Sequence, residues 1–264
     1  MAECYPIATQ NRSQCIRLSA GNQGTPYLFL DIATLQVYFS FMVRLARVVA
    51  PGFPHHITQR GNRRQKTFFN DTDYQEYIDL MSEWCCRFNV EVWAYCLMPN
   101  HIHLIAVPES EDGLRLAIGE AHRRYTRRIN FREGWRGHLW QGRFASYVMD
   151  EDYLLACVRF IEMTPVRAGL VKKPEQWPWS SASAHISGYD DTLVKAIPLL
   201  EIKGCTWKDF LSAAIGEKEI TKMQKHEKTG RPLGSRSFVE NLETILGRIL
   251  KPKKPGRKPK GEQK

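Results

Sequence analysis

The sequence predicts an α+β fold in which helices pack on a small, mainly antiparallel sheet. Two observations predict it. Strand-like and helix-like segments alternate between residues 54 and about 185. Within them, a β-hairpin is indicated by alternating side chains in Val90–Leu97, turn residues at Met98-Pro99-Asn100 and a second strand, His101–Val107.

The remaining elements follow from periodicity and capping residues. The expected elements are a strand at His55–Gly61, a helix at Asp71–Phe88 capped by Asp71 or Thr72, a helix at Gly113–Arg132, a strand at Phe144–Met149, and a helix at Asp150–Glu162 that Asp150 caps and Pro165 stops. The 113–132 helix has a clear apolar stripe, formed by Leu114, Ile118, Ala121, Tyr125 and Ile129. Its other faces carry Arg123, Arg124, Arg127 and Arg128.

The chain divides into four predicted parts. Residues 1–41 show no sustained period and are expected to be a poorly ordered extension, and residues 42–190 form the main domain. Residues 191–250 are expected to form a helical extension. Residues 251–264 are rich in Pro, Gly and Lys, so they predict a disordered basic tail in which Arg257 and Lys258 can contact phosphate.

Composition narrows the class of protein. Of 264 residues, 43% are hydrophobic and the net charge is +10, which fits a folded protein and favours a polyanionic partner such as nucleic acid. Seven cysteines, an odd number without C-x-x-C spacing, argue against a disulfide framework or a zinc ribbon and predict a cytoplasmic location. No apolar run predicts a membrane span.

His101-Ile102-His103 is the sharpest local feature. Alternate residues of a strand point to the same face of a sheet, so both imidazoles are expected to leave one face together. That geometry suits two ligands of one metal ion. The spacing also occurs on exposed strands without a metal, so it leaves both interpretations open.

Tyr125 lies among arginines on the longest predicted helix. Its place on the apolar stripe favours a core aromatic residue. However, seven arginines and only two carboxylates lie between Arg115 and Arg136, so a phenol in this segment would have groups nearby that can hold a phosphate. His55 and His56, which open the first strand, remain unassigned.

Five ordered motifs together resemble a known family. They are MPNHIHLI at 98–105, RYT at 124–126, GHLWQGRF at 137–144, TPVRAGL at 164–170 and WPWSS at 177–181. The chain resembles the single-tyrosine HUH transposases, and most closely the REP-associated tyrosine transposases linked to palindromic repeats. The resemblance extends from about Met42 to His185 and into the segment at 228–235.

The resemblance implies a ferredoxin-like sheet and a metal-dependent reaction on DNA. His101 and His103 become ligands of Mg²⁺ or Mn²⁺, and Tyr125 becomes the nucleophile that cleaves and rejoins single-stranded or hairpin DNA through a 5′-phosphotyrosine. The family's third ligand, Gln or Asn one turn after the tyrosine, falls on Ile129, so Asn130 is the expected substitute. Expected DNA contacts are Arg123, Arg124, Arg127, Arg128, Trp140 and Arg143.

Three functions therefore compete. The first is a metal-dependent strand transferase or nickase that uses Tyr125, as a monomer or homodimer. The second is a domesticated DNA-binding protein that keeps the fold but has lost the chemistry, as the apolar residue at 129 suggests. The third is a metal hydrolase acting on another phosphodiester. Trp135, Trp140 and Phe144 are either base-stacking platforms or core residues.

Overall fold

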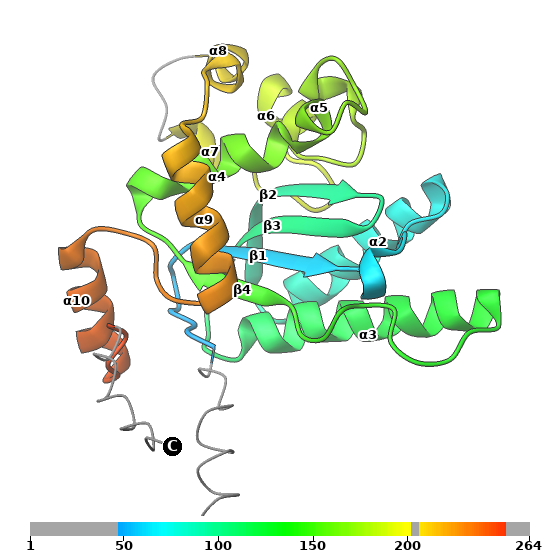
Figure 1. Cartoon of the computed structure of the whole chain (residues 1–264), viewed down its shortest axis with the longest axis horizontal. Coiled ribbons are helices and arrows are strands. Elements are labelled where there is room, and N and C mark those ends of the chain that lie inside the picture. The colour runs from blue at the N-terminus through cyan, green and yellow to red at the C-terminus, as the bar shows by residue number, and fades with distance from the viewer. Residues whose placement is uncertain (1–46, 202–205, 252–264) are drawn as a thin grey trace, which may run out of the picture. The chain divides into compact units, whose positions relative to one another are not determined.

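The computed structural model describes residues 47–201 and 206–251. Its sheet contains β1 (His55–Arg60), β2 (Val90–Met98), β3 (His101–Pro108) and β4 (Ala145–Val148) in the order β2-β3-β1-β4 (Figure 1). All three neighbouring pairs are antiparallel. The predicted extension at 1–41 and the tail residues Arg257 and Lys258 lie outside the described residues.

The described helices are α2 (Asp71–Arg87), α3 (Gly113–Glu133), α4 (Glu151–Glu162), α5 (Thr164–Arg167), α6 (Ala182–Ser187), α7 (Ile197–Glu201), α8 (Trp207–Ser212), α9 (Glu217–Thr229) and α10 (Arg236–Leu246), with short 3₁₀ turns at Asn62–Arg64 and Pro174–Gln176. The four strands and the helices α2 and α3 follow one another in the order β-α-β-β-α-β. The described elements after β4 are all helical. This order and the sheet topology confirm the predicted α+β, ferredoxin-like fold.

The sheet separates two hydrophobic cores. One face packs against α2 and α3 and contains Ile57, Ile102 and Leu104. The other face contains Ala94, Cys96, Ile105 and Tyr147 and packs against α4 and α9. Successive residues of a strand point to opposite faces, so each strand contributes to both cores.

The predicted boundaries of the main elements agree with the structure to within one or two residues, with one error in capping. The N-cap of α2 is Asn70, whose side chain accepts a hydrogen bond from the Asp73 amide. Neither Asp71 nor Thr72 is the cap, because both already lie inside the first turn. Asp150 caps α4 as expected, and its side chain accepts from the Tyr153 amide.

The segment after residue 190 joins the same cores. Leu199, Trp207, Phe210 and Met223 belong to the core on the α4 face. The last helix, α10, contributes Leu242 to a smaller cluster with Val48 and Ala50. No helix of the described part of the chain is both long and apolar enough to cross a membrane.

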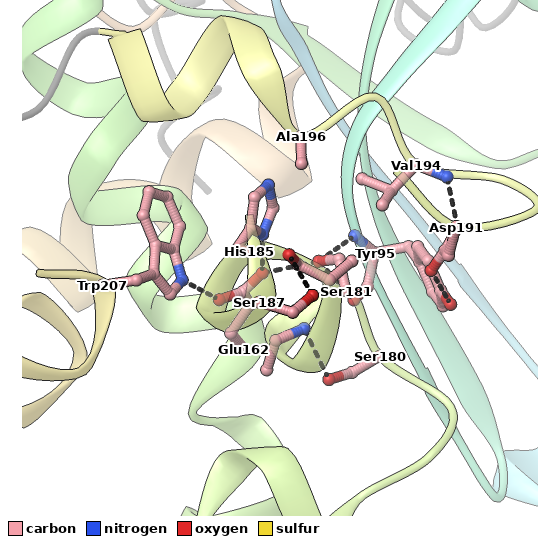
Figure 2. A network of polar contacts seen from close by, with 12 residues as sticks. Tyr95, Glu162, Ser180, Ser181, His185, Ser187, Asp191, Val194, Ala196 and Trp207 are labelled. Atoms are coloured by element: carbon pink, nitrogen blue, oxygen red, sulfur yellow. Dashed lines mark hydrogen bonds and ion pairs between the residues drawn. The ribbon is translucent and has the colours of Figure 1, made fainter. Parts of the chain in front are cut away.

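A buried carboxylate connects α4 to its neighbours (Figure 2). Glu162 is fully buried, and its Oε1 accepts hydrogen bonds from the Ser181 hydroxyl at 2.6 Å and from His185 Nδ1 at 2.5 Å. Its Oε2 accepts from Trp207 Nε1 at 2.7 Å. Ser181 and His185 belong to the start and body of α6, and Trp207 begins α8. The carboxylate therefore fixes the end of α4 relative to both helices.

Candidate functional site around the histidine pair

His101 and His103 leave the same face of β3, as the alternation of strand residues predicts. Their ring centroids are 5.1 Å apart. His103 also contacts the Phe160 ring of α4, and Ile102 between the two histidines belongs to the core on the opposite face. The pair therefore lies on the α4 face of the sheet.

Each of the two imidazoles is oriented through its Nδ1 atom. His101 Nδ1 lies 2.6 Å from the Asn100 side-chain oxygen, so it donates the hydrogen. His103 Nδ1 lies 3.0 Å from His56 Nε2, and His56 Nδ1 lies 3.0 Å from the Tyr147 hydroxyl. With neutral rings, two proton orders satisfy these contacts. In the first, His103 donates to His56 and His56 donates to the Tyr147 hydroxyl. In the second, the Tyr147 hydroxyl donates to His56 and His56 donates to His103.

The first proton order leaves a lone pair on the Nε2 atom of both His101 and His103, and it is the order that a metal ion bound at these two atoms would require. Neither Nε2 has a hydrogen-bond partner among residues 47–201 and 206–251. Metal-binding histidines usually donate their second ring nitrogen to a fixed partner in this way. The donor set therefore fits two ligands of a divalent ion.

The protonation of the three histidines is set mainly by burial. Burial lowers the pKa of His101 to about 4, and the Arg60 guanidinium acts in the same direction. Burial also lowers the pKa of His56 to about 3 and lowers that of His103 well below its ordinary value. All three rings are thus neutral near pH 7, as either proton order requires.

Two guanidinium groups and one carboxylate surround the pair. Arg60 is aligned with His101 in the β1–β3 register, and Arg167 stacks on Phe160 with its Cζ 4.3 Å from the ring centroid. Glu227 of α9 accepts a hydrogen bond from the Thr58 hydroxyl at 3.0 Å and lies 3.9 Å from Arg60. The two arginines can contact a phosphate that reaches the histidines. We call His56, His101, His103, Arg60, Phe160 and Arg167 the histidine site.

The aromatic ring that faces the pair is Phe160. Its centroid is 5.8 Å from that of His103, with the two planes nearly perpendicular at 88°. A phenyl ring carries no hydroxyl, so it offers no oxygen nucleophile. Tyr147, the nearby phenol on this face, is fully buried with its hydroxyl beside His56 and Cys157.

Tyr125, the expected nucleophile, lies on the opposite face of the sheet. Its ring is fully buried in the core between the sheet and α2 and α3, where it contacts Phe68, Tyr77 and Trp140. Its hydroxyl donates to the Thr67 carbonyl oxygen at 2.6 Å. Burial raises the pKa of this phenol, and the Asp73 carboxylate acts in the same direction. The structure therefore does not bring Tyr125 to the histidine pair.

Replacing Tyr125 with phenylalanine tests this placement. We expect a loss of about 1 kcal/mol in the free energy of unfolding, the typical value of one hydrogen bond, and unchanged DNA affinity. Urea titration and a DNA-binding assay measure the two quantities. A strong loss of DNA binding or of strand cleavage in a stably folded variant would instead return Tyr125 to the functional site.

The expected third metal ligand is also absent from the histidine site. Asn130 lies near the end of α3, on the other side of the sheet, and its side-chain amide donates to the Gly137 carbonyl oxygen at 2.9 Å. Within residues 47–201 and 206–251, no group of three or more His, Cys, Asp or Glu side chains is arranged to hold a metal ion. The histidine pair would therefore need water or phosphate oxygens to complete a coordination shell.

The expected DNA contacts divide into two groups. The arginines Arg123, Arg124, Arg127, Arg128 and Arg143 are exposed. Trp140 is only 6% exposed and packs against His122 in the core, so it is not a surface for DNA bases. Phe144 is likewise buried, whereas Trp135 is 43% exposed.

Three residues of the histidine site, Arg60, Phe160 and Arg167, were not predicted from the sequence, and His56 was left unassigned. His56 could have been found from strand alternation, because residues 56, 58 and 60 leave one face of β1 together. Phe160 carried no signal, since a phenylalanine on an amphipathic helix is read as a core residue.

Comparison with known proteins agrees with the motifs and the fold. A family model described as transposase IS200-like matches residues 52–164. A Haemophilus influenzae protein named as a REP-associated tyrosine transposase is 30% identical over 122 residues, which cover 42% of this chain and 69% of that protein. The REP-associated tyrosine transposase of Escherichia coli is 27% identical over 92 residues, which cover 34% of this chain and 53% of that protein.

The structure of a REP-associated tyrosine transposase bound to a REP hairpin has a TM-score of 0.49 and 23% sequence identity, and the match covers 59% of this chain and 92% of that one. The residues matched by the family model include β3, which carries the histidine pair, and α4. The chain therefore belongs to the family of REP-associated tyrosine transposases.

Proposed function

We propose that this chain binds DNA at the histidine site without forming a covalent link through a tyrosine of its described core. The observation that carries the proposal is the ring opposite His103. It belongs to Phe160, whereas Tyr125 is buried behind the sheet with its hydroxyl bonded to Thr67. The proposal is thus the DNA-binding alternative among the functions predicted from the sequence.

The residues of the histidine site would hold a phosphate in two ways, through a bound metal ion and through two arginine side chains. His101 and His103 would hold a divalent ion through Nε2, while His56 and Asn100 fix the two rings through Nδ1. When bound, the ion supplies positive charge that attracts a DNA phosphate oxygen. Arg60 and Arg167 add positive charge near His103, and guanidinium groups suit phosphate geometry.

Mg²⁺ and Mn²⁺ remain the proposed ions. The family resemblance favours them, although two imidazoles alone would also accept Zn²⁺. The DNA is proposed to be a single-stranded palindrome that folds into a hairpin, in keeping with the family's association with palindromic repeats. The basic net charge of +10 supports an acidic partner of this kind.

The test incubates the chain with a labelled single-stranded palindromic DNA and Mn²⁺. We expect a complex on a native gel, but no adduct that survives denaturation. Chelation of the ion should weaken binding about tenfold, the size of one good charged contact. The double variant His101→Ala/His103→Ala should bind at the weaker level whether or not Mn²⁺ is present.

One observation favours strand transfer as a second candidate function. Within residues 47–201 and 206–251 neither Nε2 atom has a hydrogen-bond partner, so both are open to a metal ion. The nucleophile would then be a phenol other than the buried Tyr125 and Tyr147. A denaturation-resistant adduct, mapped by mass spectrometry to a tyrosine, would establish this reaction and overturn the proposal. DNA cleavage without an adduct would favour the hydrolase.

A further inference from the structure

The outward side of α3 combines positive charge with a bare aromatic ring. Phe131 is 90% exposed, although it lies within a helix whose inner stripe is buried. It lines one shallow hollow on the surface together with Arg123, Arg124, Arg127 and Arg128. Among the described residues, the lining of this hollow, which we call the α3 hollow, contains no carboxylate.

Helical spacing explains why these side chains meet. Arg127 and Arg128 precede Phe131 by four and three residues, so they are its neighbours on the helix surface. Arg123 lies one further turn along the same side. The buried residues Tyr125 and Ile129 occupy the opposite side and anchor the helix against the sheet.

The arginines of the hollow differ in how far they are already neutralised. Arg123 binds Glu120 at 2.5 Å, and Arg128 forms an ion pair with Glu76 of α2. Arg127 has no ion-pair partner in the part of the chain that the structure describes. Its charge next to Phe131 is therefore the one most available to a ligand.

We propose that the α3 hollow binds unpaired bases of single-stranded DNA, an inference that rests on the proposed DNA-binding function. One base stacks on the Phe131 ring, and Arg127 contacts the adjoining phosphate. Proteins that bind single strands use this combination, because every base has a face that can stack and every linkage carries a negative charge. An apolar partner would not need the four arginines.

The location of the α3 hollow in the fold limits which segment of a bound DNA it can contact. α3 covers one face of the sheet, whereas the histidine pair lies on the other. The two sites therefore contact different segments of DNA. An unpaired loop or flank on the α3 hollow would leave another segment for the histidine site.

The experiment compares two labelled oligonucleotides with equal numbers of phosphates, an oligothymidine of about 20 nucleotides and an abasic strand of the same length. Fluorescence anisotropy gives the Kd of each. Phe131→Ala is expected to weaken binding of oligothymidine about tenfold and to leave the abasic strand unchanged. Phe131→Trp should keep the wild-type affinity, because it keeps a ring that stacks.

Two charge variants complete the design. Arg127→Gln should weaken both strands and lower the slope of log affinity against log salt by about 0.7. Arg115→Gln, on the same helix but outside the hollow, is the matched control and should change neither strand by more than about twofold. Circular dichroism verifies that each variant keeps its helices.

The outcomes separate this inference from the proposed function. Wild-type protein that binds no DNA would refute both. Wild-type binding with an unaltered Phe131→Ala variant, or an equal loss on both strands, would refute the stacking site alone. A change in sedimentation mass with unaltered DNA affinity would also refute it and would assign the hollow to a second copy of the chain.

Discussion

Replacing Phe160 with tyrosine is expected to give the chain a covalent reaction with DNA. The new phenol would be carried by the ring that contacts His103, beside Arg167. Attack of its oxygen on a DNA phosphorus would form a 5′-phosphotyrosine and release a 3′-hydroxyl. With Mn²⁺ and a labelled hairpin, adduct on a denaturing gel should rise by about 100-fold or more over the wild-type background.

Three controls define that result. Phe160→Leu should form no adduct, because it removes the ring without adding a hydroxyl. Adding His101→Ala and His103→Ala to the tyrosine variant should abolish the adduct, whereas adding Tyr125→Phe should not affect it. A tyrosine variant that binds DNA normally yet gives no adduct would mean that ring 160 cannot reach a bound phosphate.

Among the substitutions proposed for this protein, Glu162→Ala should lower the free energy of unfolding the most. The carboxylate accepts hydrogen bonds from Ser181, His185 and Trp207, and all three side chains are buried. Without it, three buried donors lose a charged acceptor and a cavity remains. We expect the free energy of unfolding to fall by about 3–5 kcal/mol, with a fall of roughly 10 °C in Tm.

Trp207→Phe is the matched variant for this network. It removes one donor to Glu162 and keeps most of the ring that stacks on His185, so a loss of about 1 kcal/mol is expected. Chemical denaturation measures both variants. If Glu162→Ala unfolded at the same denaturant concentration as Trp207→Phe, the carboxylate would not be the centre of the network.

Local patterns were sufficient for the secondary structure and for part of the site. The Asp71–Arg87 helix and the hairpin of β2 and β3 follow from apolar period and turn residues. Strand alternation also predicted that His101 and His103 share a face. The same alternation placed Ile102 in the other core, where it is fully buried.

The partners of the histidine pair could not be predicted in this way. Phe160, which contacts His103, lies in α4 and is 57 positions further along the chain. Arg167 lies in the next helix, α5, and its guanidinium group lies over the Phe160 ring. Such contacts depend on how α4 crosses the sheet. The pattern of α4 specifies that one of its sides is buried, but not which side chain of the sheet it meets.

By itself, the sequence determined that Tyr125 is on the buried stripe of α3 and that the arginines are on its outward side. Only the tertiary structure decided that this stripe packs on the face of the sheet away from the histidines. The reason is that an apolar stripe indicates which side of a helix is buried, but it does not indicate which of the two sheet faces that side packs against. In this fold both crossover helices, α2 and α3, cover one face, and the histidines of β3 point to the other.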